Sequence, residues 1–148
     1  MTWRDYWNGD SPIYVSDRHK QVHYRRIAED IAGFLTTGRE RVLDYGSGEA
    51  LSADIVAARA GHLYLSDGAE TVRRRIAERF GGLGNLTVLA PEDIGRIEPG
   101  SIDLVVVNSL LQYLSRGELA ALLPVLRDTL RLDGRLLIAD VIPPAVGP

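Results

Sequence analysis

Short apolar runs alternate along the chain with longer stretches in which apolar residues recur every three or four positions. The short runs have the length of buried strands, and the periodic stretches have the length of amphipathic helices. The alternation predicts an α/β fold with a parallel sheet that is covered by helices on both faces. The predicted strands are 41–45, 62–66, 86–89, 102–107 and 135–141. The predicted helices are 18–35, 51–60, 70–80 and 116–132, with a turn or short helix at 91–94.

Polar residues and helix breakers set the expected ends of these elements. Ser16 or Asp17 is placed to cap the first helix, and Gly61 stops the second. Asp133-Gly134 closes the fourth helix, and Pro124 inside it implies a kink or a break.

Composition excludes several classes of protein. The 148 residues suit one core, and the net charge of −3 disfavours a protein that mainly grips phosphate backbones. The absence of Cys excludes disulfides, Cys-bound zinc and iron–sulfur clusters. No apolar run reaches the ~18 residues that span a bilayer, and the first residues do not form a signal peptide. We therefore expect no membrane span and a cytoplasmic location.

The strongest local signal is a strand that leads into a glycine-rich turn and then a helix, at 42–50. Such loops hold part of a nucleotide beyond the strand ends of open α/β sheets. A dinucleotide-binding loop needs a third glycine where this chain has Leu51, and the Lys of a phosphate-binding Walker loop is absent. Asp44 precedes the first glycine, Gly46, by two residues. A carboxylate there suits a cationic nucleoside such as S-adenosylmethionine (SAM) better than a pyrophosphate.

A second acid follows the second predicted strand. Asp67 lies 19 residues after Gly48, where a carboxylate can accept hydrogen bonds from both hydroxyls of a ribose. The alternative is that Asp44 and Asp67 are plain strand-end residues.

With these motifs the sequence resembles the class I SAM-dependent methyltransferase family over roughly residues 40–141. The family's first motif, hydrophobic-x-(Asp/Glu)-x-Gly-x-Gly-x-(Gly/Ala), is matched by 43–50, with Ala50 at the third glycine position. The resemblance implies a doubly wound, mainly parallel five-stranded sheet in the order 3-2-1-4-5. It also implies that Asp44 orients the ammonium group of SAM, that Gly46 and Gly48 lie against its amino-acid part, and that Asp67 binds its ribose.

Three further stretches extend the resemblance. Residues 91–94 resemble the segment that holds the adenine edge, with Asp93 as the candidate for its exocyclic amine and Ala90 as the alternative occupant of the family's acidic position. Residues 101–108 resemble the fourth strand, and 130–138 the turn before the fifth. The implied cofactor is SAM, with S-adenosylhomocysteine (SAH) as product. The expected cofactor-binding residues are Asp44, Tyr45, Gly46, Ser47, Gly48, Asp67, Gly68, Glu92, Asp93, Ile94, Asn108 and Ser109.

The expected domain organisation has two parts. Residues 1–38 form an aromatic segment and a helix, and 39–148 form the SAM-binding Rossmann-like domain. The aromatic residues either close the core or form a lid over SAM. The family's full sheet continues with a strand hairpin that is lacking before Pro148, so we expect a C-terminal truncation. The aromatic residues are Trp3, Tyr6, Trp7, Tyr14 and Tyr24.

The sequence favours a small molecule as methyl acceptor. The family's signature Asn/Asp-Pro-Pro-Tyr is absent after Asn108, which weighs against exocyclic amines of adenine and side-chain amides as acceptors and leaves oxygen, carbon or nitrogen of a small molecule. Nucleic acid is disfavoured as a partner. His19, His23 and Tyr113 are candidates for a general base, and the sequence selects none of them. The spacing of the two histidines fits a metal, but the Glu of the metalloprotease signature is missing, so no metal site is expected. The alternative functions are a non-catalytic or truncated SAM-binding module and a nicotinamide-dependent enzyme. The sequence sets no oligomeric state.

Overall fold

The structure is a computed structural model, and it describes residues 15–140. One five-stranded sheet forms its centre, with the order β3-β2-β1-β4-β5. Every pair of neighbouring strands is parallel, which confirms the predicted order and direction. The strands are β1 (Arg41–Tyr45), β2 (His62–Ser66), β3 (Leu86–Leu89), β4 (Ile102–Asn108) and β5 (Leu130–Ala139).

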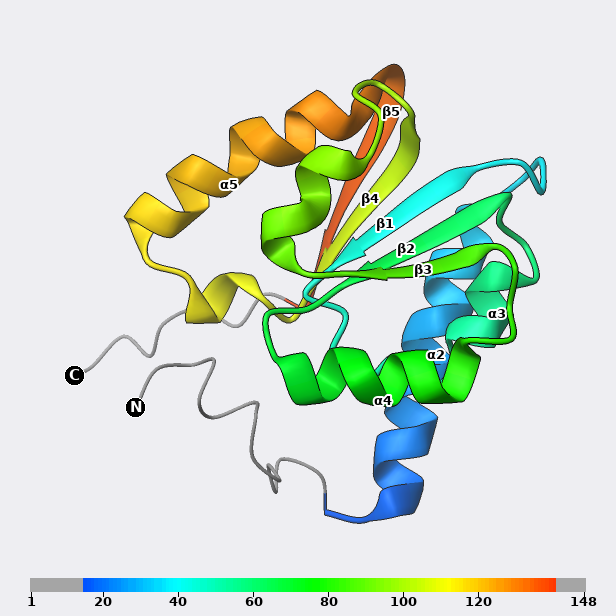
Figure 1. Cartoon of the computed structure of the whole chain (residues 1–148). Coiled ribbons are helices and arrows are strands. Elements are labelled where there is room, and N and C mark those ends of the chain that lie inside the picture. Colours follow the sequence, from blue (N-terminus) through cyan, green and yellow to red (C-terminus); the bar gives the residue numbers. More distant parts are fainter. Residues whose placement is uncertain (1–14, 141–148) are drawn as a thin grey trace.

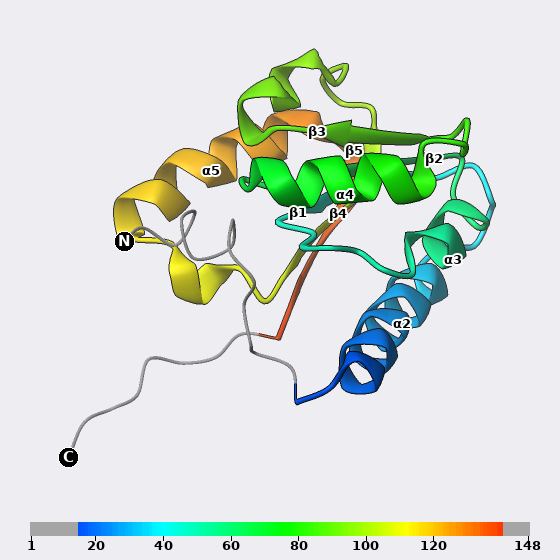
Figure 2. The ribbon, with the colours of Figure 1, turned by 60° about the horizontal axis from the view of Figure 1, so that its bottom comes forward.

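Helices cover both faces of this sheet, as predicted for a doubly wound fold. Figure 1 shows α2, α3 and α4 on one face, with α5 and the segment that follows β3 on the other, and Figure 2 shows the same two layers after rotation. The α-helices are α2 (Asp17–Gly33), α3 (Ala53–Ala57), α4 (Glu70–Phe80) and α5 (Arg116–Thr129). Two 3₁₀ helices, η1 (Pro91–Arg96) and η2 (Leu111–Tyr113), follow β3 and β4.

Two apolar clusters, one on each face of the sheet, form the core. Successive strand residues point to opposite faces, so Val42 joins the cluster under α2, α3 and α4, and Leu43 joins the cluster under α5. Ile76 of α4 and Leu126 of α5 are the corresponding buried helix residues, at 0% and 2% exposure. Burial on both faces explains why the central strand β4 is almost continuously apolar in sequence.

Hydrogen bonds at the helix ends fix where α2 and α5 begin. The Ser16 hydroxyl accepts from the His19 backbone N–H at 3.1 Å, so Ser16 is the cap of α2. Ser115 and Glu118 form a reciprocal capping box at the start of α5. The helix continues through Pro124 without a break, in contrast to one of the two predicted outcomes.

Several boundaries differ from those predicted. The helix expected at 51–60 is shortened to α3, because the turn that begins with the glycines extends to Ser52 and Ala50 adopts a φ of 44°. The fourth helix ends at Thr129, and the strand expected from Arg135 begins at Leu130. Regular pairing with β4 resumes only where Arg135 meets Leu104.

The connection between α2 and β1 is built around a buried carboxylate. Glu40 is 8% exposed, and its Oε1 accepts the backbone N–H groups of Thr36 at 2.7 Å and Thr37 at 2.8 Å. Its Oε2 accepts from the Arg39 N–H at 3.2 Å. Burial acts to raise the pKa of Glu40, but these donors outweigh it and hold the pKa well below its usual value.

Some predicted features lie outside the described residues. These are Trp3, Tyr6, Trp7 and Tyr14 of the candidate lid and the segment 141–148. Within the described residues, none of the helices combines the length and the apolar character that crossing a membrane requires.

Candidate functional site

The glycine-rich turn leaves β1 at the carboxyl edge of the sheet, and two glycines shape it. Gly46 has a φ of 77° and Gly48 a φ of 58°, in the left-handed region that favours glycine. A Cβ on Gly46 would lie 2.8 Å from Leu110 Cδ2, and one on Gly48 would lie 2.6 Å from Tyr24 Oη. Both positions therefore need glycine for its conformation and for the close approach of a neighbour.

The first three backbone N–H groups of this turn are hydrogen bonded to β2. Gly46 and Ser47 both donate to the Ser66 carbonyl, at 2.7 and 3.0 Å. Gly48 donates to Asp67 Oδ2 at 3.0 Å. These bonds fix the turn against the end of the neighbouring strand, and they leave these N–H groups without a proton to offer to an anionic ligand.

Two helices hold the fourth residue of the turn, Glu49. Its N–H donates to Tyr24 Oη of α2 at 3.1 Å. Its carboxylate, which is 19% exposed, forms ion pairs with Lys20 of α2 at 2.7 Å and with Arg75 of α4 at 3.4 Å. Side chains of α2 and α4 thus hold the turn at Glu49. All four consecutive backbone N–H groups from Gly46 to Glu49 are hydrogen bonded within the protein.

Asp44 lies at the base of the turn. It is 7% exposed, and its Oδ1 is buried without a hydrogen-bond partner among the described residues. Burial, and then the nearby charge of Asp67, raise the pKa of Asp44 to about 7. Asp44 pairs with Leu65 in the sheet, so the ends of β1 and β2 bring the two acids together. An unpartnered buried carboxylate is well placed to receive a cation or a hydrogen-bond donor.

Asp67 directly follows β2 and is held by backbone donors. Besides the bond from Gly48, its Oδ1 accepts the Ala69 N–H at 2.8 Å. Burial raises the pKa of Asp67, against the lowering effect of these bonds and of Arg73. Each carboxylate oxygen can accept more than one bond, so Asp67 retains acceptor capacity for a ligand.

The two aspartates face a cavity of about 360 Å³ at the carboxyl edge of the sheet. This is where open α/β sheets bind ligands. Nine of the predicted cofactor-binding residues line it: Asp44, Tyr45, Gly46, Ser47, Gly48, Asp67, Gly68, Asn108 and Ser109. The structure therefore brings together the residues that the sequence placed after β1, β2 and β4.

The other three predicted residues lie outside the lining of this cavity. Ile94 is 1% exposed and belongs to the core beneath α5. Asp93 forms an ion pair with Arg96 at 3.2 Å, and Glu92 belongs to the same 3₁₀ helix. Pro91 is the residue after β3 that lines the cavity, and proline has no N–H to donate. The segment after β3 thus presents an apolar surface to the cavity.

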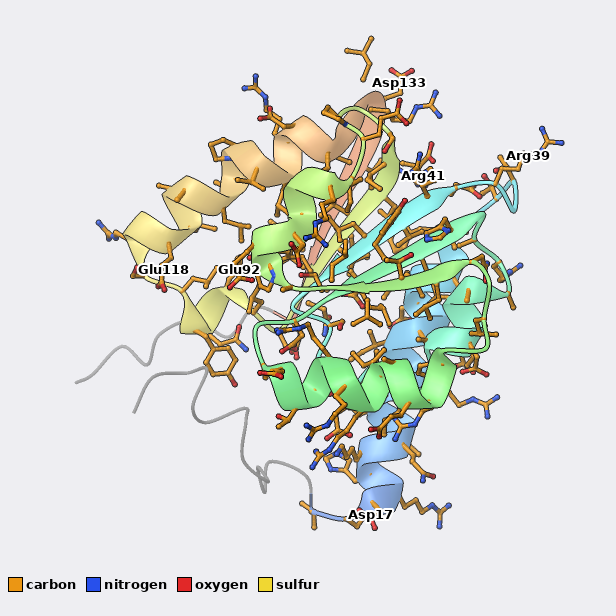
Figure 3. All side chains as sticks on the ribbon, viewed as in Figure 1. Asp17, Arg39, Arg41, Glu92, Glu118 and Asp133 are labelled. Atoms are coloured by element: carbon orange, nitrogen blue, oxygen red, sulfur yellow. The ribbon has the colours of Figure 1, made fainter. Side chains whose placement is uncertain are left out.

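Sequence reasoning missed one wall of the cavity, which α5 supplies. Glu118, Ala121, Leu122 and Val125 line it at the i, i+3, i+4, i+7 spacing of one helix face. The capping box at Ser115 was the available signal, since it fixes the first turn of α5 and hence the phase of this face. Figure 3 shows Glu118 and Glu92 at this end of the molecule, and Asp133 and Arg39 at the opposite end of the sheet.

α2 and η2 supply the remaining polar side chains of the wall. His23 and Tyr24 belong to α2, and Tyr113 ends η2. Of the three candidate bases, His23 and Tyr113 line the cavity and His19 does not. Ile27, one helical turn after His23, also lines the cavity, and the sequence had not indicated it as a site residue.

Comparisons with known proteins identify the fold. No protein-family model matches the chain, and no curated protein matches it. Among solved structures it resembles a SAM-dependent methyltransferase from Leishmania major, with a TM-score of 0.65 and 14% identity over 91% of this chain and 58% of that one. It also resembles DhpI in complex with SAH, with a TM-score of 0.67 and 17% identity over 91% and 65%.

A third structure of this kind is phosphoethanolamine N-methyltransferase 1 from Haemonchus contortus in complex with phosphoethanolamine and SAH. The TM-score is 0.60 and the identity 18%, over 84% of this chain and 33% of that chain. The architecture is a Rossmann-like α/β fold. More particularly, it is the fold of the class I SAM-dependent methyltransferases. The chain spans between 33% and 65% of the length of these three structures.

Proposed function

We propose that the chain binds SAM in the cavity at the end of β1 and transfers its methyl group to a small-molecule acceptor. The observation that supports this most is the buried, unpartnered carboxylate of Asp44 beside Asp67. Two adjacent carboxylates destabilise each other's charge, and a cationic ligand relieves that repulsion. SAM has a sulfonium and an ammonium group, so it fits this electrostatic environment.

The same geometry disfavours a ligand that binds through a pyrophosphate. A phosphate-binding loop presents free backbone N–H groups. Here the N–H groups of Gly46, Ser47, Gly48 and Glu49 are all engaged. Between Gly46 and Glu49 a nicotinamide dinucleotide would meet nearby acids and no free backbone N–H group, so the nicotinamide-dependent alternative loses support.

The residues of the chain have distinct roles in this proposal. Asp67 accepts the ribose hydroxyls through the acceptor capacity left on its two oxygens, and Asp44 accepts the ammonium group. Bound SAM supplies an activated methyl group, so the protein needs to align the acceptor and exclude water. His23 and Tyr113 are placed to take a proton from an acceptor that arrives protonated.

The proposed division of the chain follows the walls of the site. The helix of the 1–38 segment contributes His23, Tyr24 and Ile27, and the 39–148 domain contributes the turn, the strand ends and α5. We propose that 1–38 acts as a side wall of the SAM site. The lid formed by its first residues remains a prediction.

Calorimetric titration of the full chain with SAM, SAH and NADH tests the assignment. We expect binding of SAM and SAH and none of NADH. Asp67→Ala should weaken SAM binding at least tenfold, because it removes charge-assisted hydrogen bonds of roughly 1.5–3 kcal/mol each. Asp54→Ala, at an exposed position on α3, is the matched control and should leave the affinity unchanged. Unchanged affinity in a folded Asp67→Ala protein would remove this residue from the site.

A non-catalytic SAM-binding module is the second candidate. The chain spans 33% and 58% of two of the methyltransferase structures that it resembles, so SAM binding and methyl transfer are tested separately. SAM binding without SAH production against a panel of amines, alcohols and thiols would support the module. SAH production with any of these acceptors would support the enzyme.

A further inference from the structure

A polar cluster lies where β4 and β5 end, beside the proposed SAM site. Ser109 lines the cavity, and its hydroxyl donates a short hydrogen bond to the Asp140 carboxylate. The Ser109 N–H donates to the Ala139 carbonyl at 3.0 Å, which ties the two strand ends together. Ser109 and Asp140 have φ values of 52° and 54°, a left-handed conformation that non-glycine residues rarely adopt. Such outliers concentrate at functional sites, so this cluster is a candidate for a specific role.

The hydrogen bonds of this cluster determine what it can offer a ligand. A serine hydroxyl has one proton and two lone pairs. The Ser109 proton is engaged by Asp140, and Asn108 Nδ2 lies 3.2 Å from the same oxygen and takes one lone pair. One lone pair remains. Gln112 donates its Nε2 to the Ser109 carbonyl at 2.9 Å, and its Oε1 is buried without a partner among the described residues. Ser109, which lines the cavity, therefore offers an acceptor, and it fits a ligand with an N–H donor.

The charge of the cavity points to the same kind of ligand. Its described lining residues include the carboxylates of Asp44, Asp67 and Glu118, and no Lys or Arg. Asp44 is more than nine-tenths buried, and its Oδ1 has no partner among the residues described. An acceptor with a phosphate or carboxylate group would be repelled here, whereas a cation would be attracted.

We propose that the methyl acceptor is an amine that enters as an ammonium ion and is held at the Ser109–Asp140 cluster. This proposal rests on the proposed function. One ammonium N–H donates to the free lone pair of Ser109, and Asp140 acts through Ser109 as a positioning residue. By keeping the serine proton, Asp140 ensures that the hydroxyl accepts rather than donates. An alcohol has a single proton and no charge, so it satisfies this site less well.

The reaction at this site balances without a further reactant. The ammonium ion first loses one proton, to a basic side chain at the cavity such as His23 or to water. The nitrogen lone pair then forms the new C–N bond as the C–S bond breaks, and the electron pair of the C–S bond stays on sulfur. The products are a methylated ammonium ion and neutral SAH. The Ser109–Asp140 cluster orients the nitrogen lone pair toward the methyl group of SAM.

The test uses the full chain saturated with SAH and three probes of matched size: n-butylammonium, butan-1-ol and butanoate. Affinities are measured at pH 7 by calorimetry or ligand-observed NMR. We expect butylammonium to bind about tenfold tighter than butan-1-ol, and butanoate to bind most weakly. Asp140→Asn and Ser109→Ala should each reduce the butylammonium affinity about tenfold and leave butan-1-ol within about twofold. Asp133→Asn, at the opposite end of the sheet (Figure 3), makes the same change of charge and should have no effect.

The outcomes separate this proposal from the function on which it rests. Circular dichroism spectra and melting temperatures like those of the natural chain show that both variants fold. An unchanged SAH affinity in Asp140→Asn, whose residue lies outside the lining of the cavity, shows that the SAM site is intact. If SAH binds but the affinity for butanoate equals or exceeds the affinity for butylammonium, the amine assignment is wrong and the SAM assignment stands. If the preference for butylammonium survives both variants, Ser109 and Asp140 do not create it and the proposal is overturned. If SAH and SAM do not bind at all, the proposed function fails and the amine assignment fails with it.

Discussion

Replacing Asp44 by Asn should make the protein more stable at alkaline pH and should weaken binding at the proposed SAM site. The carboxyl group of Asp44 is buried beside Asp67, and its pKa is raised from 3.8 to about 7. In the unfolded chain the group ionises near its ordinary value. Between these two pKa values the folded protein binds a proton that the unfolded chain has released. The favourable contribution of that proton is complete below the unfolded pKa and is lost as pH rises through the folded pKa.

The size of the effect follows from the two pKa values. Relative to the fully protonated group, ionisation of Asp44 destabilises the folded state by about 0.6 kcal/mol at pH 4, about 2 kcal/mol at pH 5 and about 4 kcal/mol at pH 8, at 1.36 kcal/mol per pKa unit. Asn has nearly the shape of the protonated carboxyl group and does not titrate. The stability of Asp44→Asn relative to the natural chain should therefore increase by about 2–3 kcal/mol between pH 5 and pH 8.

Urea denaturation followed by circular dichroism at pH 5 and pH 8 measures this difference. Asp128→Asn, at an exposed position of α5, is the matched control for replacing an aspartate by its amide. SAM affinity, measured on the same proteins, should fall in Asp44→Asn because the partner for the ammonium group has lost its charge. A variant whose stability changes with pH in parallel with the natural chain would refute the assignment of a raised pKa to Asp44.

Two further predictions concern stability. Ala50→Gly should be less destabilising than Ala77→Gly within α4, which should cost about 1 kcal/mol. At Ala50, which has a φ of 44° and is 8% exposed, relief of the left-handed conformation offsets the loss of a buried methyl group. A larger loss in Ala50→Gly than in Ala77→Gly in thermal unfolding would contradict the reasoning. Glu40→Gln should cost roughly 2–3 kcal/mol at pH 7, because the amide cannot accept all the N–H groups that the carboxylate accepts. Because the pKa of Glu40 is lowered, the stability that its carboxylate contributes is present above the ordinary pKa near 4.5 and declines as the pH falls below that value. Urea titrations that give the same cost of Glu40→Gln at pH 3.5 and at pH 7 would refute this account.

Local patterns were sufficient to predict most of the framework. The bounds of β1, β2, β3 and α4 match those expected, because each is an apolar or periodic segment between strong breakers. The early start of β5 was missed, because Leu130 is recruited by pairing with Ile102 rather than by its own sequence context. Pairing across the sheet is a tertiary effect that local patterns do not contain.

The site was predictable where it lies on strand ends and less so elsewhere. Asp44 lies near the end of β1 and Asp67 directly follows the adjacent parallel strand β2, so their proximity follows from topology alone. The wall formed by Leu122 and Val125 depends on how α5 packs against the sheet, which the sequence does not specify. Asp93 was predicted to contact the exocyclic amine of adenine only because of the resemblance. The ion pair that Asp93 forms with Arg96 is a local contact within the 3₁₀ helix.

The turn after β1 has a kinetic consequence. Because each N–H from Gly46 to Glu49 already has a partner in the protein, the ligand-free turn needs no rearrangement before an encounter. The turn is therefore preorganised for a ligand, and little conformational entropy of its backbone is lost on binding. If the proposed SAM site is right, a slow step in binding would originate in other parts of the chain.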